Sequence, residues 1–204
     1  MQRSEGKVLN VVLVEPEIPA NTGNIGRTCV ITGARLHLVG PLGFDLSDQA
    51  VRRAGLAYWE SLDFRTYRDW DELVDLNQTL RAGLMQKSEP IVHLLTKHGE
   101  RIYSDSTYHD GDWLIFGKES SGLSAELLGD HPALCERIPM RSDEALGNAT
   151  AWHESFDELH PELERDICGN FVDRRAGQIT SLNLSNAAAI VIYEALRQTG
   201  FAGL

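Results

Sequence analysis

An apolar segment near the N-terminus, Val8–Val14, stops at Glu15 and is followed by the glycine-containing stretch PEIPANTGNIGR. Short apolar runs bounded by turn residues are typical of buried β-strands. Asn and Thr are preferred helix N-caps because their side-chain oxygens accept free backbone N–H groups, so we expect a helix from about Thr22 to Gly33. A strand that passes directly into a helix favours an α/β fold, in which ligands bind at the carboxyl ends of the strands. Arg27 would bring a permanent cation to that crevice, which indicates an anionic partner.

The alternation of strand and helix patterns continues along the chain. We expect strands at Arg35–Val39, Asp63–Tyr67, Pro90–Thr96, Trp113–Phe116 and Cys135–Ile138. Cap residues predict helices from Ser47 to Ala54, from Asp69 to Arg81, after Ser124, and from Leu184 to Gln198 with a C-cap glycine at Gly200. This alternation predicts a largely parallel sheet, and 204 residues suffice for a single domain over residues 1–204.

The segment from about 142 to 180 interrupts this rhythm. Between Asp143 and Ala176 it holds nine acidic and three basic residues, so more than half of the formal net charge of −11 lies there. Phe156, Leu159 and Leu163 have helical spacing, although Pro161 must start or kink such a helix. Because long unstructured loops are uncommon in compact domains, we interpret the segment as a partly helical surface insertion.

Hydropathy and cysteine spacing bear on the compartment. No apolar run is long enough to span a membrane, and the N-terminus lacks the pattern of a signal peptide, so we expect a cytoplasmic protein without a membrane partner. Cys29, Cys135 and Cys168 are widely spaced and show no CxxC or Cys/His metal spacing. Reduced thiols and the absence of a metal site are therefore expected.

The acidic balance at first argues against a nucleic-acid partner, because phosphate binding needs Lys and Arg. The charge is uneven, however, and Arg52 and Arg53 together with Arg27 and Arg35 form a candidate basic patch. A solvated helix face would explain Arg52 and Arg53 equally well.

Three separated segments contain residues suited to ligand contact. They are Asn21–Arg27, Phe116–Leu123, and Ile138–Met140 together with Ser181–Asn186. Glycine directly after a strand permits close backbone approach by a ligand, and amide side chains offer both donors and acceptors. Taken singly, each segment also has a structural interpretation. Asn21 and Asn24 could be helix caps, Glu119 could favour a turn or a helix N-terminus, Ser181–Asn186 could be an N-cap sequence, and Tyr193 could be a core residue.

Asp112 excludes a phosphate loop around Gly117. Gly117-Lys118 followed by serines has part of the GxxxxGK[ST] pattern, but Asp112 stands where the upstream glycine is required. The sequence therefore does not predict a nucleoside triphosphatase of the P-loop class.

The complete set of motifs is more specific than its parts. In chain order they are EPEIPANTGNIGR (Glu15–Arg27), PLGF (Pro41–Phe44), RRAGLAY (Arg52–Tyr58), LTKHG (Leu95–Gly99), DGDWLIFGKESSGL (Asp110–Leu123), RIPM (Arg137–Met140) and SLNLSNA (Ser181–Ala187). This set resembles the SPOUT superfamily of RNA methyltransferases, and within it the bacterial tRNA (cytidine/uridine-2′-O)-methyltransferases of the wobble nucleotide. The resemblance covers nearly the whole chain except the first seven residues and about 142–180.

The resemblance implies a parallel-sheet fold with a C-terminal trefoil knot, S-adenosylmethionine as cofactor, tRNA as partner, and a homodimer whose active site is completed across the interface. It implies a cofactor pocket lined by Leu95, Gly117, Ile138 and Ser181, with Met140 and Leu182 nearby. The candidate catalytic residues are Arg27 and Asn21 from the first motif, Glu119 from the second, Asn183 and Ser185 from the third, and Tyr193. Arg52 and Arg53 are the candidate RNA contacts.

The expected reaction is methylation of the ribose 2′-hydroxyl of the wobble nucleotide, cytidine or uridine 34, in an anticodon loop. Two alternatives remain open. The chain could methylate another tRNA or rRNA site, or it could be a knotted RNA-binding protein without catalysis. The segment near 142–180 separates RIPM from SLNLSNA, and a tolerated loop, a lid or an acidic surface beside the RNA are all compatible with it.

Overall fold

The computed structural model describes residues 8–46, 58–85, 91–140, 164–165, 171–172, 181–201 and 204. The predicted helix at Ser47–Ala54, the candidate RNA contacts Arg52 and Arg53, and the predicted helix around Leu159 lie outside these residues. Within the acidic segment the structure describes only a short antiparallel pair, β8 (Glu164–Arg165) and β9 (Phe171–Val172).

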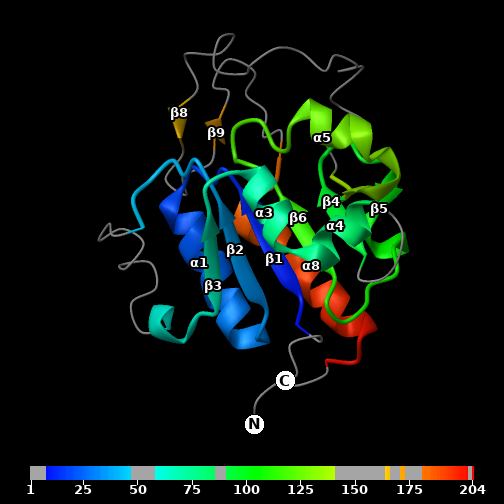
Figure 1. The fold of residues 1–204 in the computed structure, drawn as a ribbon, viewed down its shortest axis with the longest axis horizontal. Coiled ribbons are helices and arrows are strands. Elements are labelled where there is room, and N and C mark those ends of the chain that lie inside the picture. The colour runs from blue at the N-terminus through cyan, green and yellow to red at the C-terminus, as the bar shows by residue number, and fades with distance from the viewer. Residues whose placement is uncertain are drawn as a thin grey trace.

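Seven parallel strands form one sheet in the order β3-β2-β1-β6-β4-β7-β5 (Figure 1). They are β1 (Asn10–Val14), β2 (Arg35–Val39), β3 (Phe64–Tyr67), β4 (Val92–Leu95), β5 (Arg101–Ile102), β6 (Trp113–Phe116) and β7 (Cys135–Arg137). The α/β class with a parallel sheet is thus confirmed. Of the seven strands of this sheet, β5 alone was not predicted, because a strand of two residues has no periodicity to detect.

Helices cover both faces of the sheet (Figure 1). The first face carries α1 (Pro19–Thr32) and α8 (Leu184–Gln198), which pack against each other. The other face carries α3 (Trp70–Leu76), α4 (Gln78–Leu84) and α5 (Ala125–Asp130). Short 3₁₀ turns lie at η1 (Trp59–Ser61), η2 (Tyr103–Asp105) and η3 (Pro132–Leu134).

Two hydrophobic cores follow from the alternation of side chains along the strands. On β1, Val11 and Leu13 belong to the core beneath α1 and α8, whereas Val12 between them belongs to the core beneath α3, α4 and α5. At the central strands β1 and β6 both faces are buried, which explains why these two strands read as nearly continuous apolar runs rather than alternating ones.

Two helix boundaries differ from the sequence prediction. Helix α1 begins at Pro19 rather than near Thr22, since proline at the first helical position has its φ already set and has no N–H to leave unpaired. The helix predicted from Asp69 to Arg81 is two helices, because the backbone at Asn77 is extended. Asp69 does cap the first of them, accepting the N–H of Glu72 at 2.9 Å.

The last helix matches its prediction at both ends. Gly200, with φ of 72°, follows it in the left-handed conformation, and the N–H of Phe201 bonds to the carbonyl of Leu196 at 2.8 Å. In the part of the chain that the structure describes, no helix is long and apolar enough to cross a membrane. The predicted knot stays a prediction, because the chain between Met140 and Ser181 that would complete it lies mostly outside the described residues.

Candidate active site

The three candidate segments meet at the carboxyl ends of β1 and β6, which are neighbours at the centre of the sheet. From β1 the chain runs outward through β2 and β3, whereas β4, β7 and β5 lie on the other side of β6. A change of direction of this kind leaves a crevice above the strand ends, which is where open α/β sheets bind ligands.

A chain of side-chain hydrogen bonds joins the three segments. The Asn21 amide Nδ2 donates to Glu119 Oε1 at 2.9 Å, and Asn183 Nδ2 donates to Asn21 Oδ1 at 2.9 Å. Asn21 is 1% exposed, so its amide is almost wholly committed to these neighbours. The structure therefore brings together Asn21, Glu119 and Asn183 from positions far apart in the sequence.

Asn21 is not the helix cap that its position near the turn suggested. It lies inside the first turn of α1, and the N-cap residue is Ile18, whose side chain cannot cap. The missing cap is supplied from a distance, because the Glu119 carboxylate accepts the N–H of Glu17 at 2.8 Å and that of Ile18 at 3.3 Å. A carboxylate at a helix N-terminus is also favoured by the helix dipole. Glu119 thus fixes the start of α1 against the loop after β6.

Asn183 performs two tasks at the start of α8. Its Oδ1 caps the helix by accepting the N–H of Ser185 at 2.9 Å and that of Asn186 at 3.3 Å. The Ser185 hydroxyl donates to the same oxygen at 2.6 Å. Asn183 is therefore the cap within the predicted N-cap sequence Ser181–Asn186, and Ser185 holds the Asn183 amide oriented toward Asn21.

A second set of contacts holds the loop after β6 against the loop after β1. The Glu17 carboxylate accepts both the N–H of Ser120, at 2.9 Å, and its hydroxyl, at 3.0 Å. Lys118 forms an ion pair with Glu15 at 3.3 Å. Glu17 was not singled out from the sequence, and nothing in its local pattern distinguishes it from an ordinary surface carboxylate.

Gly117 has a structural reason for lacking a side chain. A Cβ there would lie 2.1 Å from the Gly122 carbonyl carbon and 2.2 Å from the Leu123 nitrogen, because residues 118–122 fold back on themselves. The predicted reason, close approach by a ligand, is thus not needed to explain this glycine. The same tight turn presents Glu119 toward α1.

Arg27 lies apart from this hydrogen-bonded chain. It is exposed on α1, and its guanidinium carbon is 5.2 Å from the centre of the Tyr58 ring, a cation–π distance. The Tyr58 hydroxyl in turn donates to the Gly23 carbonyl of α1 at 2.6 Å. Burial raises the pKa of Tyr58, although the charge and hydrogen bond of Arg27 oppose the rise. Tyr58 thus links the Arg27 guanidinium to the backbone of α1.

The candidate cofactor residues divide into two groups. Leu95 ends β4, Gly117 follows β6 and Ile138 follows β7, so they lie at adjacent strand ends. Leu95 and Ile138 are half-buried and pack against the first core. Ser181 and Leu182 are exposed just before α8, and Met140 is half-buried at the end of the described chain after β7.

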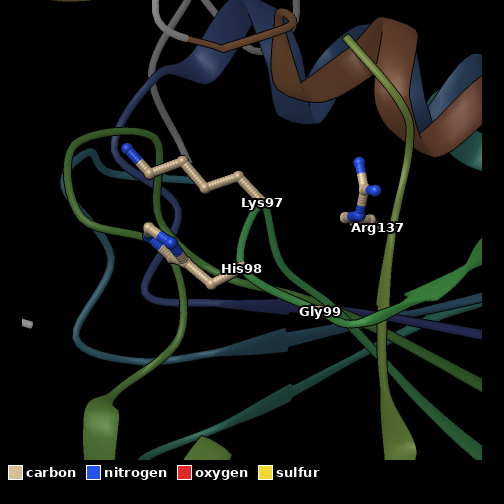
Figure 2. A pocket seen from close by; sticks show the side chains of 4 residues that line it. All are labelled: Lys97, His98, Gly99 and Arg137. Carbon is tan, nitrogen blue, oxygen red and sulfur yellow. The ribbon is translucent and has the colours of Figure 1, made fainter. Parts of the chain in front are cut away.

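A shallow hollow of about 270 Å³ lies at the carboxyl ends of β4 and β7 (Figure 2). It is lined by Lys97, His98, Gly99 and Arg137. Figure 2 shows Lys97 and His98 on one side and Arg137 on the other, with Gly99 between them. In the sequence these residues stand out only as parts of the LTKHG and RIPM motifs.

Tyr193 is on the surface rather than in the core. It is 45% exposed on α8, in line with Asn186, Ile190 and Arg197, which are also exposed. A core position was the structural interpretation of this residue, and it is wrong, because the buried positions of α8 are Ala188, Val191, Ile192, Ala195 and Leu196.

Comparison with known proteins identifies the family of this chain. The model of the SpoU rRNA Methylase family matches residues 8–148, so the chain belongs to that family of methyltransferases. A tRNA (cytidine(34)-2′-O)-methyltransferase of Burkholderia cenocepacia is 39% identical, over 96% of this chain and 99% of that protein.

Solved structures show the same architecture. A structure that addresses the 2-OH methylation of C/U34 on tRNA is 31% identical with a TM-score of 0.68, and covers 96% of this chain and 98% of that one. The methyltransferase AviRb of Streptomyces viridochromogenes, solved in complex with AdoMet, is 24% identical with a TM-score of 0.65, and covers 96% of this chain and 62% of that one. The SPOUT methyltransferase fold class is thus confirmed.

Proposed function

We propose that this protein transfers a methyl group from S-adenosylmethionine to the ribose 2′-hydroxyl of nucleotide 34, cytidine or uridine, in a tRNA anticodon loop. The observation that carries the proposal is the hydrogen-bonded chain Glu119–Asn21–Asn183, which joins the three motifs at the carboxyl ends of β1 and β6. The relatives that cover nearly the whole chain support the choice of substrate, since their names specify cytidine 34 of tRNA.

The residues at the strand ends fit the cofactor. Leu95 and Ile138 offer a half-buried apolar surface for an adenine, and the neighbouring backbone offers hydrogen-bonding groups. Gly117, Met140, Ser181 and Leu182 would complete the pocket. When bound, S-adenosylmethionine supplies a methyl group already activated by its sulfonium charge, so the donor needs no metal ion.

Arg27 acts on the nucleophile. A ribose hydroxyl is a poor nucleophile until its proton leaves, and negative charge then develops on the 2′-oxygen. An arginine is not deprotonated in proteins, so Arg27 stabilises that charge and orients the adjacent phosphate rather than serving as the base. Stacking on Tyr58 keeps the guanidinium at a defined place on α1.

Glu119, Asn21, Asn183 and Ser185 are positioning residues in this proposal. Their observed partners are one another and the helix starts, which sets α1, with Arg27 on it, relative to α8 and the loop after β6. Alignment of reactants contributes several kcal/mol, about 7–11 in favourable cases, so a small displacement of α1 lowers the rate strongly.

The protein is proposed to act as a homodimer that completes each active site across the interface. Helices α1 and α8 lie side by side and present two parallel exposed stripes, Ala20, Asn24, Arg27 and Ile31 on one and Asn186, Ile190, Tyr193 and Arg197 on the other. Ile31 is 61% exposed and Ile190 37%, so apolar side chains and the catalytic candidates Arg27 and Tyr193 share this surface.

An Ile190→Glu substitution tests the dimer. A charge placed in an apolar interface is costly, so sedimentation should show a monomer where the native protein is dimeric, and methylation should fall with it. Leu76→Glu is the matched control, since Leu76 is 68% exposed on α3, on the opposite face of the sheet. A native chain that sediments as a monomer, or an Ile190→Glu variant that remains dimeric, contradicts this interface.

Methyl transfer to total tRNA tests the function. Labelled S-adenosylmethionine should label tRNA at a single ribose, nucleotide 34, as mapped by nuclease digestion and mass spectrometry. Label at another tRNA nucleotide, or in ribosomal RNA alone, would establish the alternative substrate. Calorimetry with the cofactor separates the second alternative, because a non-catalytic RNA-binding protein need not bind S-adenosylmethionine.

A further inference from the structure

The basic hollow of Lys97, His98, Gly99 and Arg137 has no role in the proposed chemistry so far. It lies at the carboxyl ends of β4 and β7, next to two candidate cofactor residues, Leu95 and Ile138. Three of its four lining residues carry nitrogen donors and none is acidic. In a chain of formal net charge −11, such a local concentration of basic groups needs an explanation.

Many basic side chains elsewhere are engaged with acidic partners. Ion pairs with carboxylates involve Arg35, Arg68, Arg81, Lys118 and Arg197. Lys97 is exposed and forms no ion pair with any residue that the structure describes. Among the described residues, its charge is therefore available to a ligand without breaking an ion pair.

The hollow is held in shape by the backbone. The Thr96 N–H donates to the Glu136 carbonyl at 2.9 Å, which joins the loop after β4 to β7. Gly99 lies against the same segment so closely that a Cβ there would be 2.7 Å from the Glu136 carbonyl carbon. The Thr96 hydroxyl also accepts the His98 N–H at 3.3 Å. The loop that carries Lys97 and His98 is thus fixed relative to Arg137.

The acidic residue that precedes Arg137 on β7 has its side chain in the protein interior. Glu136 is 1% exposed, and its carboxylate accepts hydrogen bonds from Ser106 and Tyr108 and lies 2.7 Å from His93 Nδ1. Ser106, Tyr108 and His93 compensate its charge inside the protein. The Glu136 carboxylate therefore does not cancel the basic character of the hollow.

The size of the hollow favours a small anionic group. Pockets for whole cofactors measure about 300–1,000 Å³ and are largely apolar, whereas this one is about 270 Å³, open and polar. Burial and the charge of Lys97 lower the pKa of His98, so near neutral pH its ring is a hydrogen-bonding group and Lys97 and Arg137 supply the charge.

We propose that this hollow binds a backbone phosphate of the substrate RNA beside the nucleotide being methylated, with Lys97 and Arg137 as its charged contacts. The inference rests on the proposed function, because a phosphate site next to the candidate cofactor residues is useful only if methyl transfer to RNA occurs at those residues. The hollow would give this acidic protein a phosphate contact in addition to the expected RNA contacts Arg52 and Arg53.

The test is the salt dependence of tRNA binding by Lys97→Gln. Loss of one phosphate contact should reduce the slope of log affinity against log salt by about 0.7–0.9, and lower affinity about fivefold near 0.15 M salt. Lys97→Arg should restore the slope, since it keeps the charge. Arg65→Gln is the matched control: Arg65 is an exposed cation on β3, at the far edge of the sheet, and its loss should leave the slope unchanged.

Two outcomes overturn the proposal. One is an unchanged slope in Lys97→Gln. The other is a Lys97→Gln variant that loses affinity for S-adenosylmethionine in the absence of RNA while its tRNA slope is native, which would assign the hollow to the carboxylate of the cofactor. These measurements need no turnover. If the protein does not methylate tRNA but its salt slope still depends on Lys97, the proposed function is rejected and the phosphate site is retained.

Discussion

Replacing Arg27 with Ala should lower the turnover number for methyl transfer by at least about 10²-fold, the usual cost of removing a group that stabilises developing negative charge. Affinity for S-adenosylmethionine should stay native, because Arg27 is exposed on α1 and the candidate cofactor residues lie at the ends of β4, β6 and β7. Single-turnover kinetics with saturating tRNA and calorimetry with the cofactor measure the two quantities separately.

Two further variants locate the effect in the guanidinium. Arg27→Lys keeps the positive charge but loses the planar group that stacks on Tyr58, so we expect activity between the native and alanine values. Asn24→Ala is the matched control on the same exposed face, one turn earlier in α1, and should stay within a few-fold of native activity. Native turnover in Arg27→Ala would remove this residue from the mechanism.

The sequence predicted the parts of this fold that depend on local patterns. The strands at Arg35–Val39 and Trp113–Phe116 and the helix at Leu184–Gln198 are as expected, because each is an apolar run or an amphipathic segment with clear ends. The break at Asn77 was missed, since nothing in the residue types around it forbids a continuous helix.

The candidate site was predictable as a set of residues but not as a set of contacts. The motifs placed Asn21, Glu119 and Asn183 together, and the structure brings them together. That Glu119 caps a helix it does not belong to, and that Tyr58 holds Arg27, depends on how distant segments pack. Such contacts between distant segments have no local signature in a single sequence.

The hydrogen-bonded cluster around His93 was entirely outside the sequence prediction. His93 on β4 is 1% exposed, and its ring nitrogens lie 2.7 Å from Glu136 Oε1 and 3.2 Å from Asp112 Oδ2. Both ring nitrogens thus face carboxylate oxygens, which only accept hydrogen bonds when ionised, so the site favours the doubly protonated imidazolium. Burial alone would lower the pKa of His93, but the hydrogen bonds and charges of Asp112 and Glu136 outweigh it and raise that pKa.

His93→Leu should therefore be among the most destabilising single substitutions in this protein. It leaves two buried carboxylates without their shared cation, and breaking a buried pair costs about 3–5 kcal/mol. For a chain of this size that is a fall in melting temperature of roughly 6–20 °C. Calorimetric melting of native and variant proteins near neutral pH measures it.

A second buried histidine supplies the control. His37 on β2 is also 1% exposed, but its nitrogens face the Tyr67 hydroxyl and the Asn10 amide oxygen, at 2.9 and 3.2 Å. Burial, aided by the charges of Arg35 and Arg65, lowers the pKa of His37 to about 3, so this ring is neutral. His37→Leu removes hydrogen bonds without stranding a charge and should cost about 1–3 kcal/mol.

The pH dependence distinguishes the two histidines further. A folded-state pKa raised above the unfolded value of about 6.5 gives stability that is complete below that pH and is lost as pH rises through the folded pKa. The native protein should thus lose stability between about pH 6.5 and the raised pKa of His93, whereas His93→Leu should not. His37 is neutral in both states above about pH 6.5, so His37→Leu should keep the native decline. A His93→Leu variant that retains this decline, or that melts no lower than His37→Leu, would show that the charge of His93 does not hold β4 and β7 together.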